Sequence, residues 1–180
     1  LAAGLAVAPG RPLVNSVNGE EKSLENILPL VKEYQAAVIG LTMDDDGIPK
    51  TADKRVSIAG KILDRAVQIG LAKEDVIIDP LVLTVGADHN AAKVTLETIA
   101  LLRKEFGINI NLGASNVSFG LPDRHTVNQA FLALAIQAGA NCMITAPVKL
   151  NGIIKAADLL LGKDSFGRAY ITHYRATQKS

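Results

Sequence analysis

The sequence predicts an α/β fold in which parallel strands alternate with helices, and three observations support this prediction. First, strand-like and helix-like patterns alternate about five times, with roughly 30–35 residues in each unit, as in strand–helix–strand repeats. Second, the strand candidates are short continuous apolar runs, which is typical of strands buried on both faces of a parallel sheet. Third, no linker or low-complexity segment interrupts the repeats, so residues 1–180 are assigned to one domain.

Five segments are expected to be strands, and several of them end in a polar or strand-breaking residue. The clearest is Val76-Ile77-Ile78-Asp79, because Pro80 has no N–H to donate to a sheet and therefore ends the strand. Asp79 is placed at the carboxyl end of a buried strand, which is the end that faces ligands in parallel α/β folds. The expected strands span residues 12–16, 36–42, 76–79, 108–114 and 141–146.

Helices are expected between these strands, where apolar residues recur at intervals of three and four. Asn18 is assigned as the cap of one helix, with Glu21 completing a capping box, and Thr51 as the cap of the next. Gly70 and Gly107 follow two of the helices, as expected for residues that end helices. The expected helical segments are residues 1–8, 19–31, 52–69, 91–105, 126–138, 153–161 and 165–174.

The repeat number favours part of a (β/α)8 barrel. A complete barrel needs roughly 250 residues, and five units preceded by the end of a helix fit its carboxyl-terminal part, from about the fourth strand to the eighth. An open doubly wound sheet is the structural alternative, but its glycine-rich dinucleotide fingerprint is missing after the first strand. The first residues lack both a basic flank and an initiating Met, so we interpret the chain as a fragment without the first three βα units.

Composition limits the classes of function. The formal net charge is +1, which gives no electrostatic case for binding nucleic acid or an acidic membrane. No apolar stretch approaches the ~18 residues of a membrane-spanning helix. The single cysteine, Cys142, excludes a disulfide framework within the chain, and a reducing cytoplasmic setting is the natural expectation. No cluster of residues predicts a metal site, and the run from Asp44 to Asp46 is typical of a solvated turn.

Three strands end in, or are followed by, side chains that hydrogen-bond in fixed directions: Asn15, Asp79 and Asn116. In a barrel these side chains would converge on one mouth. A carboxylate accepts two donors side by side, and an amide offers both donors and acceptors. The set therefore suits a flat heterocycle such as a pterin, which presents an amino group and a ring N–H next to each other. The structural alternative is that the asparagines only cap or brace loops and that Asp79 forms a cap or an ion pair.

Five short motifs occur along the chain. They are, in order, Asn15-Ser16-Val17-Asn18, Ile39-Gly40-Leu41-Thr42-Met43, Gly47-Ile48-Pro49, Ile78-Asp79-Pro80-Leu81 and Gly113-Ala114-Ser115-Asn116-Val117-Ser118. Taken together, these motifs make the chain resemble the methyltetrahydrofolate:corrinoid methyltransferases of one-carbon metabolism, and the resemblance covers nearly the whole chain. The pterin-binding barrel of that family is shared with the folate domain of cobalamin-dependent methionine synthase and with dihydropteroate synthase.

The resemblance implies a role for each matching residue. Asp79 corresponds to the aspartate that binds the pyrimidine edge of the pterin, and Asn15 to an asparagine that also binds the pterin. Asn116 corresponds to the catalytic asparagine beside N5, the nitrogen that carries the methyl group. Arg124 corresponds to an arginine near the aminobenzoyl-glutamate tail. Gly113 and Ser115 are expected to line the same site.

The resemblance also implies what the chain works with. The substrate is methyltetrahydrofolate, and the methyl acceptor is the cobalt of a corrinoid (cobalamin) carried by a partner protein. A further pterin-binding aspartate belongs to the third strand of the barrel, which lies outside this sequence. The whole protein is expected to be a cytoplasmic homodimer.

The chemistry expected of Asn116 follows from the leaving group. A tertiary amine is a poor leaving group, because its departure leaves negative charge on nitrogen. A hydrogen-bonding group whose contact strengthens as charge develops stabilises the transition state more than the substrate.

Two rival functions belong to different classes. A dihydropteroate synthase would carry Ser-Arg-Lys after its seventh strand, where this chain has Ser115-Asn116-Val117 and no cation. A non-catalytic module that binds a pterin or a corrinoid protein would retain the same motif residues, so the sequence leaves that alternative open.

Overall fold

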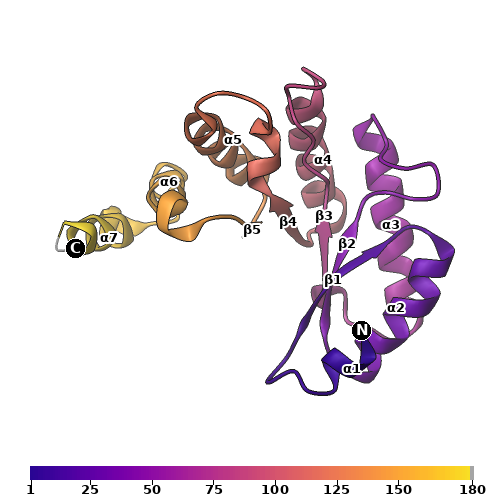
Figure 1. Cartoon of the computed structure of the whole chain (residues 1–180). Coiled ribbons are helices and arrows are strands. Elements are labelled where there is room, and N and C mark those ends of the chain that lie inside the picture. The colour runs from indigo at the N-terminus through magenta and orange to yellow at the C-terminus, as the bar shows by residue number, and fades with distance from the viewer. Residues whose placement is uncertain (179–180) are drawn as a thin grey trace.

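Five parallel strands pair in the order in which they occur along the chain, as the sequence predicts. A computed structural model describes residues 1–178 (Figure 1). The strands are β1 (Leu13–Asn18), β2 (Ala37–Leu41), β3 (Val76–Asp79), β4 (Asn109–Gly113) and β5 (Cys142–Ile144). Within the described residues, β1 and β5 are the edges of this sheet and each pairs with a single neighbour.

Helices alternate with the strands, and α2 to α5 form an arc along one side of the sheet (Figure 1). The α-helices are α1 (Ala2–Leu5), α2 (Glu21–Glu33), α3 (Ala52–Gln68), α4 (Ala91–Phe106), α5 (Arg124–Ala138), α6 (Pro147–Leu160) and α7 (Arg168–Thr177). The loops of the described residues contain three 3-10 helices: η1 (Lys73–Asp75), η2 (Ala114–Ser118) and η3 (Ser165–Gly167). None of the helices in the described part of the chain is both long enough and apolar enough to cross a membrane.

The core lies between the sheet and this arc of helices. Alternate residues of a strand point to opposite faces of the sheet. The strand residues that face the helices, such as Val38, Ile78 and Ile110, are fully buried. Gly40 lets α3 approach β2 closely, since a β-carbon at this position would lie 3.0 Å from the side chains of Ile62 and Ile78. The opposite face of the sheet carries the polar residues of the strands, and the carboxyl ends of the strands set the position of the candidate site.

Two predicted helix starts are wrong. Asn18 does not cap α2: β1 continues through it, because a register shift between Asn15 and Val17 lets Asn18 pair with Leu41. Its side-chain oxygen instead accepts a hydrogen bond from the Glu20 amide, and α2 begins at Glu21.

The sixth α-helix also starts earlier than its periodicity indicates. It begins at Pro147 rather than near residue 153. Proline is favoured in the first turn of a helix because its fixed φ is already helical and its missing N–H has no partner there.

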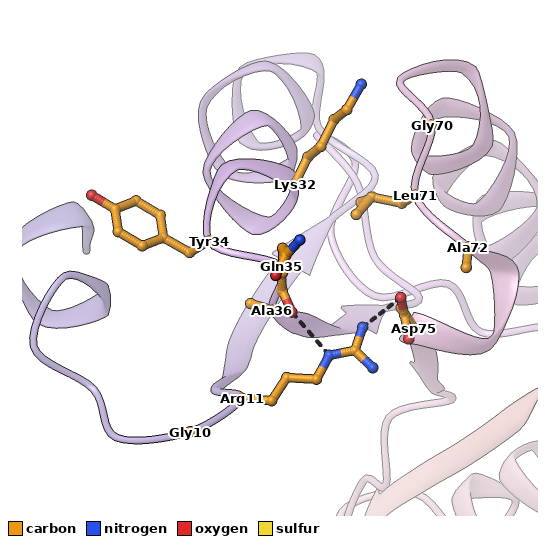
Figure 2. A pocket seen from close by; sticks show the side chains of 10 residues that line it. All are labelled: Gly10, Arg11, Lys32, Tyr34, Gln35, Ala36, Gly70, Leu71, Ala72 and Asp75. Atoms are coloured by element: carbon orange, nitrogen blue, oxygen red, sulfur yellow. Dashed lines mark hydrogen bonds and ion pairs between the residues drawn. The ribbon is translucent and has the colours of Figure 1, made fainter.

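At the amino ends of the strands, Arg11 ties three connecting segments together (Figure 2). Its guanidinium contacts the Asp75 carboxylate at 2.6 Å and donates to the Gln35 carbonyl at 2.9 Å. A hollow of about 680 Å³ opens beside this pair. Figure 2 shows the side chains of Lys32 and Tyr34 pointing away from Arg11. Contacts at this end of parallel strands serve stability rather than chemistry in barrel folds.

A buried arginine supports the carboxyl end of β3. Arg55 of α3 is 1% exposed, and its guanidinium donates to the carbonyls of Pro49, Pro80 and Leu81 at 2.9, 2.8 and 2.8 Å. Burial lowers the pKa of Arg55, but arginine stays protonated at neutral pH. One side chain therefore joins the loop after β2 to the turn after β3.

We expect Arg55→Met to reduce the free energy of unfolding by about 3 kcal/mol or more, because it leaves buried carbonyl oxygens without donors. Arg65→Met is the matched control on the same helix. Arg65 forms a surface ion pair with Glu21, and such pairs contribute about 0–1 kcal/mol. Urea denaturation of both variants measures the difference. Equal losses in the two variants would contradict the structural role of Arg55.

Candidate functional site

A cavity of about 450 Å³ lies at the carboxyl ends of the strands and combines residues from several loops. Its polar lining comes from Asp79 at the end of β3 and from the segment that follows β4. Apolar side chains make up most of the rest. The lining residues are Leu41, Ile48, Asp79, Leu81, Val82, Leu83, Gly113, Ser115, Asn116 and Ile144.

Asp79 is a buried carboxylate with both oxygens held. It is 8% exposed, and it lies on the face of the sheet opposite the helices because its neighbour Ile78 packs against them. The Leu81 amide donates to Oδ1 at 2.9 Å, and Nδ2 of Asn111 donates to Oδ2 at 2.8 Å. Each carboxylate oxygen has two lone pairs. Asp79 therefore keeps two adjacent acceptor sites for a ligand.

Burial and hydrogen bonding act on Asp79 in opposite directions. Burial raises the pKa of Asp79 above its ordinary value, while the hydrogen bonds from Leu81 and Asn111 lower it, and the net pKa shift is upward. The cause is desolvation, since a charged group loses water that two hydrogen bonds only partly replace. A buried carboxylate at the mouth of parallel strands is typical of a binding site.

Asn111 supports the candidate site from behind, and the sequence analysis does not identify it. It lies on β4 next to Asp79, within a segment that is predicted only as a strand. The alternation Asn109-Ile110-Asn111-Leu112 carries the missing signal, because two asparagines two residues apart lie on one face of a strand. That face is the one opposite the helices, since Ile110 and Leu112 are buried against them.

Asn116 and Ser115 reach the cavity from η2, directly after β4. Gly113 makes room for Asn116, because a β-carbon at 113 would lie 3.2 Å from its Nδ2. The neighbouring side chain of Val117 is buried and anchors the segment. The structure therefore places Asp79, Gly113, Ser115 and Asn116 around one cavity.

Arg124 does not line the cavity. It is the first residue of α5, and its guanidinium donates to the Ser115 carbonyl at 2.8 Å and to the Ser118 hydroxyl at 3.1 Å. It also lies 5.6 Å from the centre of the Phe119 ring, within the range of a cation–π contact. In this structure Arg124 braces η2 and thereby supports Ser115 and Asn116.

Asn15 shares the face of Asp79 but not its cavity. Asn15 pairs with Ile39, whereas Asp79 pairs with Leu41, two residues further along β2. Asn15 therefore lies one pleat below Asp79 on the same face, and it is exposed at the edge strand β1. The structure brings Asp79 and Asn116 together and leaves Asn15 at a distance of two strands.

The loops after β3 and β4 are joined above the cavity. The Thr84 hydroxyl donates to the Phe119 carbonyl at 2.7 Å, and the Val85 amide donates to the Val117 carbonyl at 3.0 Å. Within residues 1–178, no group of three or more histidine, cysteine, aspartate or glutamate side chains is arranged to hold a metal ion. The polar side chains that line the cavity, those of Asp79, Ser115 and Asn116, are hydrogen-bonding groups of the kind that orient an organic ligand.

Comparison with known proteins identifies relatives of this chain. The family model described as pterin binding enzyme matches residues 1–146. The chain is 33% identical over 178 residues to the methylcorrinoid:tetrahydrofolate methyltransferase of Eubacterium limosum, covering 95% of this chain and 64% of that protein. It is 34% identical over 163 residues to the methionine synthase of Mycobacterium tuberculosis, covering 83% of this chain and 14% of that protein. The chain thus spans less than two thirds of the length of these relatives.

Solved structures show the same fold. Dihydropteroate synthase of Yersinia pestis, with a pterine-sulfa conjugate, superposes with a TM-score of 0.69 at 17% identity, covering 90% of this chain and 66% of that one. The 7,8-dihydropteroate synthase of Vibrio fischeri gives a TM-score of 0.69 at 19% identity, covering 91% and 66%. The predicted barrel-type α/β fold is confirmed.

We expect the stability of Asp79→Asn, relative to the native protein, to rise between pH 4 and pH 8. The pKa of Asp79 is raised in the folded state, so its contribution to stability is fully present below the unfolded pKa and is lost as pH rises through the folded pKa. The amide of asparagine does not titrate, and although it leaves one of the two donors without an oxygen to accept it, that cost is the same across this pH range. Urea denaturation from pH 4 to pH 8, with Asp45→Asn in an exposed turn as the control, measures the difference. A stability difference that stays constant over this pH range would overturn this account.

Proposed function

Because the chain belongs to the family of pterin binding enzymes, we propose that Asp79, Gly113, Ser115 and Asn116 form one wall of a pterin site in a methyltransferase. The reaction we propose is transfer of the N5 methyl group from methyltetrahydrofolate to the cobalt of a corrinoid protein. The corrinoid belongs to the partner protein, and when bound it supplies reduced cobalt, Co(I), as the nucleophile.

The observation that carries this proposal is the geometry of Asp79. The pyrimidine edge of a pterin presents an amino group and a ring N–H side by side, and it needs two adjacent acceptors. Asp79 supplies two carboxylate oxygens whose orientation is fixed from behind by Leu81 and Asn111. The apolar side chains of Leu41, Leu81 and their neighbours line the same cavity, and they suit the faces of a flat ring.

We propose that Asn116 acts on the other part of the ring. It lines the same cavity as Asp79, on a segment held by Arg124. With the pyrimidine edge on Asp79, we propose that the Asn116 amide hydrogen-bonds N5 or the proton on N5. This contact strengthens as the methyl group leaves, so it lowers the barrier more than it tightens binding.

The same contacts serve transfer in either direction. The relative from Eubacterium limosum is named for transfer from a methylcorrinoid to tetrahydrofolate, the reverse of the reaction proposed above. A group that stabilises the transition state accelerates both directions, so the residues of this cavity do not select between them. Direction then depends on the relative concentrations of the folate and corrinoid forms.

The charge of the cavity disfavours the dihydropteroate synthase alternative, a condensation reaction in which diphosphate is the leaving group. A diphosphate leaving group needs cations, and none of the described residues that line the cavity is lysine or arginine. Arg124 is engaged with the Ser115 carbonyl and the Ser118 hydroxyl. The lining is suited to a methyl donor that leaves no phosphate behind.

The remaining wall of the site is proposed to lie on the β1 side. Asn15 is exposed there, on the same face as Asp79, and the resemblance implies a further aspartate from a preceding strand. We propose that Asn15 and that aspartate contact the pterin in the whole protein, and that the tail of the folate passes near Arg124. The whole protein is proposed to be a cytoplasmic homodimer.

We expect Asp79→Asn to weaken methyltetrahydrofolate binding by about tenfold or more, because the amide turns a donor towards a donor of the pterin. The change keeps the size of the side chain. Calorimetry on the protein that carries this chain measures the affinity, and Asp75→Asn, in η1 directly before the same strand, is the control. Unchanged affinity in Asp79→Asn would refute the assignment.

We expect Asn116→Ala to lower the rate of methyl transfer at saturating methyltetrahydrofolate by ~10²-fold, with a smaller effect on binding. Single-turnover transfer to a reduced corrinoid acceptor, beside a binding titration of the same variant, separates the two quantities. Asn90→Ala, an exposed asparagine at the start of α4, serves as the control. A variant with a normal rate at saturation and reduced affinity would make Asn116 a binding residue only.

A further inference from the structure

Asn111 lies behind the candidate site rather than in it. Its side chain is 3% exposed and is not part of the cavity lining. It is brought opposite Asp79 by the pairing of β3 with β4, in which Ile77 and Ile78 pair with Asn109 and Ile110. Its Nδ2 donates to Oδ2 of Asp79 at 2.8 Å. Any effect of Asn111 on a ligand must therefore pass through the Asp79 carboxylate.

The two donors to Asp79 differ in kind. The Leu81 amide is a backbone group, and its position is fixed because the Leu81 carbonyl accepts from Arg55 and from the Thr95 hydroxyl. Asn111 is a side chain, so it is the donor that a substitution can remove. Without Asn111, Oδ2 of Asp79 loses its hydrogen bond. The carboxylate is then held only by the hydrogen bond from the Leu81 amide to Oδ1 and can rotate more freely.

We propose that Asn111 is the positioning residue of the pterin site: it orients the Asp79 carboxylate and keeps it in the ionised form that accepts two donors. This inference rests on the proposed function, because it concerns the same site. It goes further in naming what makes Asp79 competent to bind.

The surroundings of Asp79 support this role, since no charged side chain among the described residues contributes to the pKa shift of Asp79. From α3, the Arg55 guanidinium faces the carbonyls of Pro80 and Leu81. From β2, the neighbour of Asp79 is Leu41, and from α4, Thr95 contacts the Leu81 carbonyl. Burial raises the pKa of Asp79, and among the described residues only the hydrogen bonds of Leu81 and Asn111 oppose it.

Removing the Asn111 donor should therefore change the pKa of Asp79 in a defined direction. In Asn111→Leu, which keeps approximate size, the pKa of Asp79 rises further, so the carboxyl is protonated up to a higher pH. A protonated carboxyl turns a donor towards the pterin donors. We expect methyltetrahydrofolate affinity to be about tenfold weaker than in the native protein at pH 5.5, and within about threefold of it at pH 8.

In Asn111→Asp, we expect the affinity to depend on pH in the opposite direction. At low pH the new carboxyl is protonated and donates to Asp79 as the amide does, while at high pH two facing carboxylates repel each other and share their last proton tightly. We expect near-native affinity at pH 5.5 and about tenfold weaker binding at pH 8. If Asn111 only filled space, Asn111→Leu would keep the native pH profile, so Asn111→Leu is the variant that tests the positioning role.

The experiment measures methyltetrahydrofolate affinity by calorimetry from pH 5 to pH 8.5 in the protein that carries this chain. The native protein corrects for titration of the ligand, and Asn109→Leu, two residues earlier on β4 and the same face, is the matched control. Thermal unfolding confirms that each variant is folded. If Asn111→Leu does not fold, Asn111→Ala, which also removes the donor without adding a charge, takes its place.

A second measurement needs no ligand. The carbon-13 shift of the Asp79 carboxyl reports its titration, which should move to higher pH in Asn111→Leu and stay at its native position in Asn109→Leu. If this titration moves as expected but no variant or native protein binds a pterin, the proposed function fails and the role of Asn111 stands. If the pterin binds and neither the pH profile nor the titration changes, Asn111 is not a positioning residue.

Discussion

The site depends on how the fold accommodates one buried charge. Asp79 ends a strand that is covered by helices on one face, and its carboxylate has little access to water. Hydrogen bonds from Leu81 and Asn111 partly replace the lost water. Behind them, Arg55 holds the carbonyls of Pro80 and Leu81. A buried cation and a buried anion thus support the same turn: backbone carbonyls accept from Arg55, and one backbone amide and one side-chain amide donate to Asp79.

The features that follow from local pattern were predictable from the sequence. The order and direction of the strands follow from the alternation of apolar runs and amphipathic segments, because parallel strands require crossover helices. The location of Asp79 followed from the proline after it, and that of Asn116 from the end of the next strand. These arguments need only the neighbours of a residue along the chain.

What the sequence did not predict depends on partners across strands. The role of Asn111 could not be predicted, because it depends on the register between β3 and β4. That register places Asn111 beside Asp79. Asn18 was misread because a register shift in β1 moved the strand end by two residues. Arg55 looks like an ordinary helix residue, and only the fold reveals that the loops after β2 and β3 converge on it. Arg124 likewise turned out to brace η2.

The connection between the loops after β3 and β4 has a consequence for motion. Because Thr84 and Val85 hydrogen-bond the backbone of Phe119 and Val117, a displacement of one loop must carry the other with it or break both bonds. A ligand that binds Asp79 therefore meets a wall in which two loops are coupled. The rest of the lining includes Leu41 and Ile48, from β2 and the loop after it, and Ile144 at the end of β5. Those residues belong to neither of the coupled loops.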